Sequence, residues 1–404
     1  MRKFALLAGL LGLAGCAPVA PAASVAPVTA AGDYLFVWAG DVGAKTSDFL
    51  AVIDSDPRST RYAEVITTLP SGVANSYAHH TEHEMPAGGI LLASGFGAGK
   101  TFMFDLSDPL LPRLTGSFGD AGPFMHAHSF ARTPAGTILA TYQMRGHRNA
   151  EAGALAEIST DGKILRIAPA ADPAVEPFIR PYSLAVVPAL DRVVTTSSDM
   201  QAKEVSRVVQ VWRLSDLKLI KTVRLPAGPA KANEDPAEAR LLADGKTVLV
   251  STFNCGLFLM TDLDGESPGA RFVHSFAGGG ECALPVIAGR YWVQTDTKAG
   301  LVTLDISDPA KPVEVARLAL PGGQQPHWIS LAPDGERIVI SGGKGAYETR
   351  VLIARIDQAT GQISIDPAFR DRGSAGPGVS FDRASWPHGP SGKAIPHGAV
   401  FSRP

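Results

Sequence analysis

A short sequence pattern recurs along the chain at intervals near fifty residues, and this repeat limits the fold more than any other feature. Apolar, strand-like runs that end in an Asp or Ser turn finish at Ser55, Ser107, Ser159, Ser215, Asp264, Ser307 and Asp357. A period near fifty residues with four short strands in each unit is the signature of a β-propeller. The repeat therefore predicts an all-β fold, a seven-bladed β-propeller.

The two ends of this region predict how the ring closes. Residues 33–39 have the pattern of a second strand without an inner partner, and residues 397–404 have the pattern of an inner strand that stops at its turn. Pairing of these N- and C-terminal strands completes the first blade and removes open sheet edges that could recruit other chains. We therefore expect residues 33–404 to form one propeller.

Histidine occupies four of the seven equivalent positions near the start of the inner strands. In ring order these positions hold His397, His80, His128, Tyr182, Ala237, Cys282 and His327. Positions of equal phase in a closed ring form one layer around the axis, so these side chains should meet although they are distant in sequence. The four histidines belong to adjacent blades because the last blade adjoins the first. With only 10 histidines in 404 residues, this grouping points to a shared site.

Convergent imidazoles favour a metal site. Neutral imidazole is the commonest side-chain metal ligand, and rings held by rigid strands need no further support. We predict that His80, His128, His327 and His397 hold a metal ion; the alternative is a polar lining that binds an anion or a substrate. Ligation by imidazole alone favours copper, with zinc as the alternative. Copper would support oxidation by dioxygen, whereas zinc would activate water for hydrolysis.

Three further histidines are candidate ligands close to this layer. His126 lies two residues before His128, so the alternation of a strand points both the same way. His79 should point away from its neighbour His80, and we expect only one of that pair to be a ligand. His388 is a candidate near the C-terminus.

Two carboxylates and a phenol are candidate catalytic groups. Glu82 and Glu84 follow the histidine pair and could orient a ligand's free ring nitrogen or accept a proton. The alternative is that both are solvated loop carboxylates. Tyr182 occupies the equivalent position of the fourth blade and is expected to line the pocket.

The N-terminus has the features of a lipoprotein signal. A short basic region and an apolar run over residues 4–13 precede Leu-Ala-Gly-Cys16, which matches a lipoprotein cleavage box; an ordinary secretory signal is the alternative. We predict a signal peptide over residues 1–16 with lipidated Cys16, followed by an Ala/Pro-rich linker over 17–32. No later segment is long and apolar enough to cross a bilayer. The lipid alone would therefore anchor the domain, facing the periplasm and sorted to the outer membrane.

Two cysteines remain beyond the lipidation site, and the net charge is nearly zero. In an oxidising compartment Cys255 and Cys282 could form a disulfide, remain as buried free thiols, or place one thiol in the site. The formal charge of -2, from 37 basic and 39 acidic residues, gives no reason to expect nucleic acid as a partner.

An ordered set of motifs connects the chain to a known family. The motifs are residues 48–57 with 62–70, the sequence His79-His80-Thr81, the sequence His128-Ser-Phe, and residues 304–309 and 329–335. Over nearly all of the mature chain they resemble the selenium-binding protein family, whose bacterial members include methanethiol oxidases. The resemblance implies copper on a seven-bladed propeller, with ligands from His79 or His80, His128, and either His388 or His397. Glu-His-Glu-Met at residues 82–85 replaces the family's cysteine-rich segment, so selenium binding is not expected.

The resemblance also implies an activity. It indicates a copper-dependent oxidase of a small thiol such as methanethiol, with O2 as the acceptor. His327 is an addition, because better-known relatives have no histidine there. The rival reading is a non-enzymatic metal-binding or scaffold propeller, a lipoprotein of the cell envelope.

Overall fold

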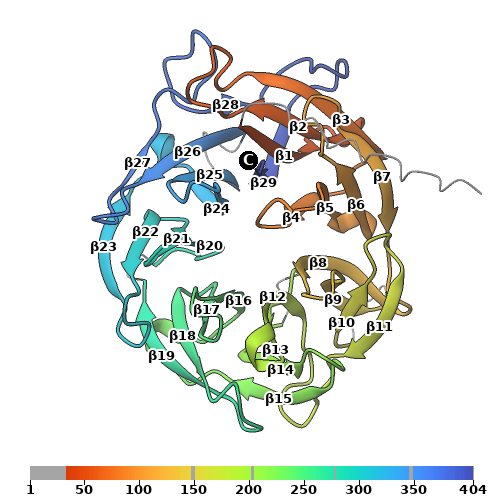
Figure 1. Ribbon diagram of the computed structural model, residues 1–404, viewed down its shortest axis with the longest axis vertical. Coiled ribbons are helices and arrows are strands. Elements are labelled where there is room, and N and C mark those ends of the chain that lie inside the picture. Colours follow the sequence, from red (N-terminus) through yellow and green to blue (C-terminus); the bar gives the residue numbers. More distant parts are fainter. Residues whose placement is uncertain (1–32, 147–150, 202–203, 277–278, 345–348, 404) are drawn as a thin grey trace, which may run out of the picture.

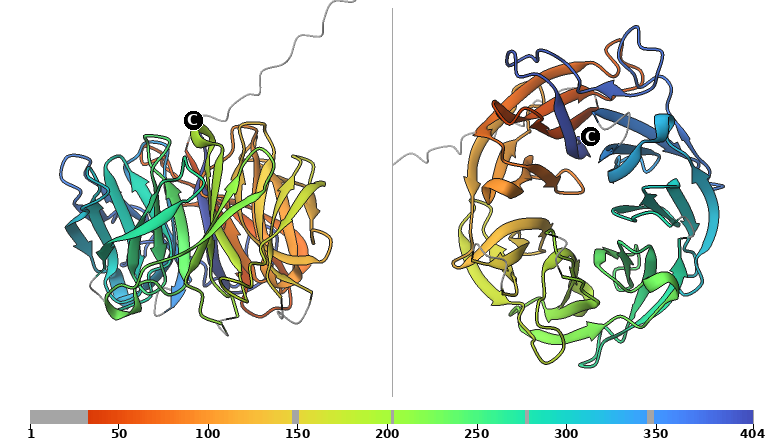
Figure 2. Two further views of the ribbon diagram at one scale, coloured as in Figure 1. Left: turned by 90° about the horizontal axis from the view of Figure 1, so that it is seen from below. Right: turned by 180° about the vertical axis from the view of Figure 1, so that it is seen from behind.

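The computed structural model describes residues 33–146, 151–201, 204–276, 279–344 and 349–403, which form seven antiparallel sheets arranged in a ring (Figure 1). Seen from the side, the ring is a flat disc in which the sheets stand as blades (Figure 2). The predicted all-β, seven-bladed propeller is confirmed. The predicted signal peptide, Cys16 and linker lie outside the described residues.

Each blade contributes four strands between the axis and the rim. In order around the ring, starting from blade 1, the innermost strands are β29 (Ala394–Phe401), β4 (Ala78–Thr81), β8 (Phe124–Arg132), β12 (Pro181–Val187), β16 (Pro236–Leu241), β20 (Pro285–Ala288) and β24 (Gln325–Leu331). The second strands are β1 (Tyr34–Asp41), β5 (Ile90–Gly95), β9 (Ile138–Arg145), β13 (Arg192–Ser197), β17 (Val248–Thr252), β21 (Tyr291–Asp296) and β25 (Arg337–Lys344).

The two outer layers follow the same order. The third strands are β2 (Ser47–Asp54), β6 (Lys100–Asp105), β10 (Ala154–Ile158), β14 (Val208–Arg213), β18 (Gly256–Thr261), β22 (Gly300–Asp305) and β26 (Arg350–Ile356). The outermost are β3 (Val65–Ala74), β7 (Arg113–Phe118), β11 (Ile164–Pro169), β15 (Leu219–Arg224), β19 (Gly269–Ser275), β23 (Val313–Leu318) and β27 (Ile363–Ile365). Four single 3-10 turns lie in connections between strands: η1 (Phe96–Ala98), η2 (Pro188–Leu190), η3 (Pro229–Lys231) and η4 (Pro321–Gly323).

Blade 1 closes the ring with strands from both ends of the propeller. β29 pairs antiparallel with β1, where Val37 faces Ala399, and the Tyr34 amide donates to the Ser402 hydroxyl at 2.9 Å. Blade 1 thus has the complete strand order β29-β1-β2-β3. The predicted closure is therefore the observed one.

The core lies between neighbouring blades. Residues 35–39 and 49–53 are fully buried along their whole length, as expected for strands covered on both faces. Trp38 of blade 1 packs against Phe102 and Phe104 of blade 2, with ring centroids 5.4 and 5.6 Å apart, and its indole N–H donates to the Ser94 carbonyl at 2.9 Å. Such packing fixes each blade, and hence each innermost strand, relative to its neighbours.

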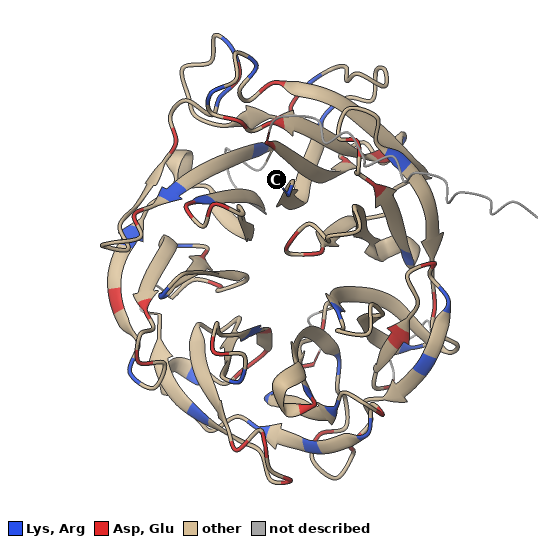
Figure 3. Cartoon of the chain, in the orientation of Figure 1, with Lys and Arg blue, Asp and Glu red and all other residues tan. Residues whose placement is uncertain are grey.

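A long connection covers the seam between blades 7 and 1. Its short strand β28 (Val379–Ser380) pairs with β26, and Phe381 and Trp386 pack against Phe49 of β2. Figure 1 places this segment outside the ring. Basic and acidic residues are interspersed around the rim (Figure 3). Among the described residues, no helix is long and apolar enough to span a membrane.

Candidate metal centre at the ring axis

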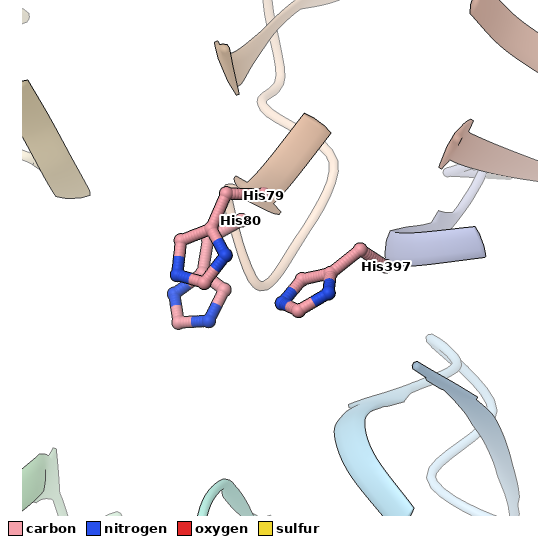
Figure 4. Close-up of side chains that lie close together, drawn as sticks. All are labelled: His79, His80 and His397. Atoms are coloured by element: carbon pink, nitrogen blue, oxygen red, sulfur yellow. The ribbon is translucent and has the colours of Figure 1, made fainter. Parts of the chain in front are cut away.

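Five imidazoles from four adjacent blades meet at the axis. The ring centroids of His79 and His80 are 4.0 Å apart, those of His79 and His397 4.4 Å, those of His80 and His128 4.5 Å, and those of His327 and His397 4.8 Å. Figure 4 shows the stacked rings of His79 and His80, both from β4, with the His397 ring of β29 turned towards them. The four histidines of equal phase therefore lie in one cluster, together with His79.

The expectation that His79 points away from His80 is wrong. Ala78 faces Gly95 on β5, but Thr81 faces Ala93, so three steps along β4 match only two along β5. The extra residue breaks the alternation of side chains, as a β-bulge does. Both rings consequently point to the axis and stack with an interplanar angle of 10°.

The same irregularity recurs at the equivalent place in other innermost strands. Register shifts occur beside His397 in β29, beside His128 in β8, beside Tyr182 in β12 and beside Ala237 in β16. Bulges bend a strand and redirect its side chains, and they are frequent next to functional sites. Repetition of the bulge, and not the repeat phase alone, thus directs these side chains to the axis.

Several ring nitrogens in the cluster are buried without hydrogen bonds. His79 and His80 are 2% and 0% exposed. Both nitrogens of His80, Nδ1 of His79 and Nε2 of His397 have no partner within the described part of the chain. An unsatisfied buried polar group costs about 1–3 kcal/mol. A cation bound between the rings would remove this cost.

The cluster keeps its imidazoles neutral. Burial lowers the pKa of His79, His80 and His397 well below the usual value, and repulsion from neighbouring rings lowers it further. Burial also lowers the pKa of His128 to about 3, although the Tyr182 carbonyl opposes the shift. Neutral imidazoles retain the lone pairs that bind metals.

His128 is held in the orientation that a ligand requires. Its Nδ1 lies 2.8 Å from the Tyr182 carbonyl oxygen and 3.0 Å from the Ser129 hydroxyl. We assign the proton to Nδ1, which donates to the carbonyl and leaves the lone pair on Nε2. That Nε2 lies 3.0 Å from Nε2 of His79. A backbone carbonyl that accepts from the other ring nitrogen commonly fixes a metal-binding imidazole in this way.

Three donors form the most compact set. One ring nitrogen each from His79, His80 and His397 lie within 4.8 Å of one another. Nitrogens about 2.1 Å from one ion are at most about 4.2 Å apart, so the set is within about 1 Å of a ligating geometry. The predicted set of His80, His128, His327 and His397 omitted His79, which belongs to the compact set.

Two predicted ligands lie elsewhere. His126 has a left-handed backbone, with φ of 60°, and its Nδ1 lies 2.7 Å from the Phe96 carbonyl oxygen. This backbone takes His126 out of the strand alternation, so it does not follow His128 into the cluster. His388 uses both ring nitrogens, with Thr68 Oγ1 at 2.7 Å and Ser391 Oγ at 3.0 Å. Of the two C-terminal candidates, only His397 reaches the cluster.

The two candidate carboxylates have other roles. Glu82 is 5% exposed, accepts two hydrogen bonds from the Arg132 guanidinium at 2.7 and 3.0 Å, and accepts another from the Leu92 amide. Burial raises its pKa, and Arg132 opposes the shift. Glu84 is exposed. The expected catalytic role of Glu82 is therefore corrected to an ion pair with Arg132, and Glu84 is a solvated loop carboxylate.

Tyr182 lies against the cluster as expected for a residue that lines the pocket. Its ring centroid is 3.8 Å from that of His128, and it is 1% exposed. The phenol has no hydrogen-bond partner in the described segments. Burial raises its pKa well above the usual value, and the carboxylate of Glu238 adds to the shift. The phenol therefore stays protonated and can donate a hydrogen bond.

A polar layer next to the cluster was not anticipated. Glu238 of β16 is fully buried and accepts hydrogen bonds from the Ser183 hydroxyl and the Arg240 guanidinium. Arg240 also contacts His83, whose ring stacks on Trp328 at 4.8 Å. The signal was present in the sequence, because charged residues at 238 and 240 alternate with alanines in an inner strand.

Cys282 occupies the equivalent position of blade 6 but offers no ligand. Its sulfur is bonded to that of Cys255, 27 residues away in sequence. Of the three alternatives that the sequence allowed for these cysteines, the structure has the disulfide. Because both sulfurs are oxidised, the donors of the cluster are imidazoles.

The fold and these side chains define a class: a propeller with a buried imidazole cluster at its axis. No family model matches the chain. It is similar to the methanethiol oxidase of Hyphomicrobium sp, with 27% identity over 361 residues that cover 82% of this chain and 79% of that protein. The chain thus resembles the selenium-binding protein and methanethiol oxidase family over most of its length, and the resemblance drawn from its motifs is confirmed.

Solved structures support the fold. A hypothetical selenium-binding protein from Sulfolobus tokodaii superposes with a TM-score of 0.71 at 15% identity, over 91% of this chain and 93% of that one. The periplasmic gluconolactonase of Pseudomonas aeruginosa superposes with a TM-score of 0.61 at 13% identity, over 83% and 95%. At such identities the likeness concerns the propeller alone.

Proposed function

We propose that this protein is a copper-dependent oxidase of small thiols with its metal at the imidazole cluster. The observation that carries the proposal is a set of buried, neutral imidazoles in which both nitrogens of His80 and one nitrogen each of His79 and His397 lack hydrogen bonds. The similarity to a methanethiol oxidase supports the thiol as substrate and O2 as acceptor. We also infer that a small molecule, and not a polymer, is the partner.

The donor set fits copper. Imidazole nitrogens suit copper and zinc, whereas oxygen-rich sites suit magnesium or calcium. Zinc has no redox chemistry, so an oxidase favours copper of the two. Bound copper would supply electron transfer and affinity for a thiolate sulfur. His79, His80 and His397 would hold the ion, with His128 and His327 beside them.

Residues around the ion would orient the substrate and limit water. The phenolic O–H of Tyr182, which has no other hydrogen-bond partner among the described residues, can donate a hydrogen bond to the thiol sulfur next to His128. Trp328 packs against His80 at 4.9 Å and covers one side of the cluster. In the overall reaction, equal amounts of thiol, dioxygen and water give an aldehyde, hydrogen sulfide and hydrogen peroxide.

Metal analysis and oxygen uptake test the proposal together. Purified protein should contain copper and should consume O2 when methanethiol is added, with release of sulfide and peroxide. A metal-free protein whose melting temperature is unchanged by copper would overturn it. Metal without oxygen uptake would indicate the non-enzymatic binding or scaffold protein, and turnover of a zinc form without oxygen would indicate a hydrolase.

We further propose that Cys16 is lipidated and anchors the propeller to the outer membrane on its periplasmic side. The support is the cleavage box at residues 13–16 and the Ala/Pro-rich stretch that follows it. Labelled palmitate should enter the wild-type protein in cells, and Cys16→Ser should abolish the label and release soluble protein. Equal labelling of both forms would contradict the anchor.

A further inference from the structure

A cavity of about 590 Å³ opens beside the imidazole cluster, and we call it the vestibule. Most of its lining comes from blades 4, 5 and 6, which have no histidine at the equivalent position, and the rest from His327 of blade 7. Tyr182 also lines it. Because both residues belong to or contact the cluster, the vestibule is an approach by which a small molecule can reach the site.

The vestibule is acidic. Its charged lining residues are Asp199, Glu204, Asp235, Glu281 and Lys298, four carboxylates against one amine. Asp199 accepts hydrogen bonds from its own loop, and Asp235 accepts one from the Ser206 amide. Glu204 and Glu281 are exposed, and among the residues described here neither side chain makes a hydrogen bond or an ion pair. The buried Arg180 guanidinium interacts electrostatically with Asp199 and Glu204 and offsets part of their charge, whereas it has no such interaction with Glu281. These two carboxylates remain available to a ligand.

Aromatic groups give independent evidence for a ligand. The Tyr182 phenol is buried, lines the vestibule and lacks a hydrogen-bond partner. The Phe253 ring lies nearly perpendicular to the Tyr182 ring, with centroids 5.4 Å apart, and lines the same cavity. Aromatic faces attract ammonium groups, and nearby carboxylates add to that attraction. The vestibule therefore combines a cation-binding outer part with a hydrogen-bond donor beside the cluster.

We propose that the vestibule selects thiols that carry a cationic amine, an inference that rests on the proposed thiol oxidase function. The ammonium group lies between Glu204, Glu281 and Phe253, and the sulfur reaches Tyr182 and the imidazole cluster. A thiol of the 2-aminoethanethiol type satisfies both ends. A thiol that carries a carboxylate instead is repelled by the same lining.

Binding of thioethers tests the selectivity without any turnover. Thioethers can neither be dehydrogenated as thiols nor exchange with the Cys255–Cys282 disulfide. We would titrate 2-(methylthio)ethylamine, ethyl methyl sulfide and (methylthio)acetate into the protein by calorimetry. We expect the cation to bind most tightly, the neutral compound less tightly and the anion least tightly. One or two nearby carboxylates should change the affinity about threefold to tenfold between successive compounds. Added salt should reduce these differences in affinity because it screens the charges. Equal affinities, or tighter binding of the anion, would overturn the inference.

Charge-removing variants locate the effect. Glu204→Gln and Glu281→Gln should each reduce the preference for the cation about threefold, and the double variant should nearly abolish it. Glu336→Gln is the matched control, because Glu336 is an exposed carboxylate in the turn between β24 and β25, which leaves β24 at the end away from His327. An unchanged preference in the double variant would contradict the assigned site.

Oxygen uptake with the matching thiols separates this inference from the proposed function. Uptake should be faster with 2-aminoethanethiol than with mercaptoacetate at limiting substrate. If the cation is preferred in binding but no oxygen is consumed, the oxidase function is refuted and the cation-binding site is still supported. Oxygen uptake at equal rates with both thiols would support the oxidase and refute the selectivity.

Discussion

The two halves of the innermost ring have the same backbone and different chemistry. Blades 7, 1, 2 and 3 place histidines at the equivalent position, whereas blades 4, 5 and 6 place Tyr182, Ala237 and Cys282 there. The histidine half fills the axis with rings 4.0 to 4.8 Å from their nearest neighbours. The other half borders the vestibule. The repeat therefore determines where each side chain of the innermost ring lies. The residue type at that position determines whether it offers a metal-binding nitrogen or leaves space for the vestibule.

Removing a donor from the histidine half should have the largest effect. His80→Ala deletes a ring whose two nitrogens make no hydrogen bonds, so the variant should fold while losing metal. We expect oxygen uptake to fall at least about 100-fold, since even changes to residues that only orient a metal ligand cost about 10–100-fold. Copper content and oxygen uptake, with circular dichroism as a check on folding, measure this.

The matched control is a histidine outside the cluster. His126→Asn keeps a side chain that tolerates the left-handed backbone at φ of 60°, and it should retain metal and activity. Equal losses in His80→Ala and His126→Asn would show that the cluster is not the metal site. Retention of metal by His80→Ala would show that His79 and His397 suffice without it.

Removing the disulfide should affect the other half of the ring differently. Replacing Cys255 and Cys282 by alanine opens a link between residues 27 apart in sequence. Loop-closure entropy predicts a loss of about 3–4 kcal/mol in the free energy of unfolding. Metal content should not change, because neither sulfur is available as a ligand. Denaturant unfolding and metal analysis test this, and loss of copper would mean that the two halves are coupled.

The sequence was sufficient for the ring and for most of the cluster. The phase of a repeat follows from residue spacing alone, so the sequence suffices to place His80, His128, His327 and His397 together. His79 could not be assigned, because the register shift between Ala78 and Thr81 depends on pairing with another strand and leaves no pattern in β4 itself.

Contacts between distant segments explain the other errors. Glu82 stands beside the histidine pair in sequence, but its partner Arg132 is 50 residues away on β8. Likewise, an even number of cysteines beyond the lipidation site allows a disulfide but does not require one. His388 lies on the seam segment, and its bonds to Thr68 and Ser391 arise only from the way that segment folds back.

Acid should destabilise the metal-free protein through its histidine half. His128 has a pKa of about 3 when folded and about 6.5 when unfolded. The unfolded state thus binds more protons as pH falls below about 6.5. The contribution of neutral His128 to the free energy of unfolding is fully present above about pH 6.5. It is lost towards pH 3, at up to about 1.4 kcal/mol per pH unit. Urea unfolding between pH 7.5 and 4.5 tests this, and greater stability at pH 5 than at pH 7 would contradict it.

Neutralising the two loop carboxylates should have the smallest effect on activity. Glu84→Gln alters an exposed side chain and should change stability by less than about 0.5 kcal/mol. Glu82→Gln weakens a buried ion pair with Arg132 and should cost about 1–3 kcal/mol. Neither should change kcat by more than about twofold, because Glu82 is held by Arg132 and Glu84 lies in solvent. A fall in kcat of tenfold or more in Glu82→Gln, with metal content and fold intact, would return that residue to the catalytic set and extend the site beyond the imidazoles.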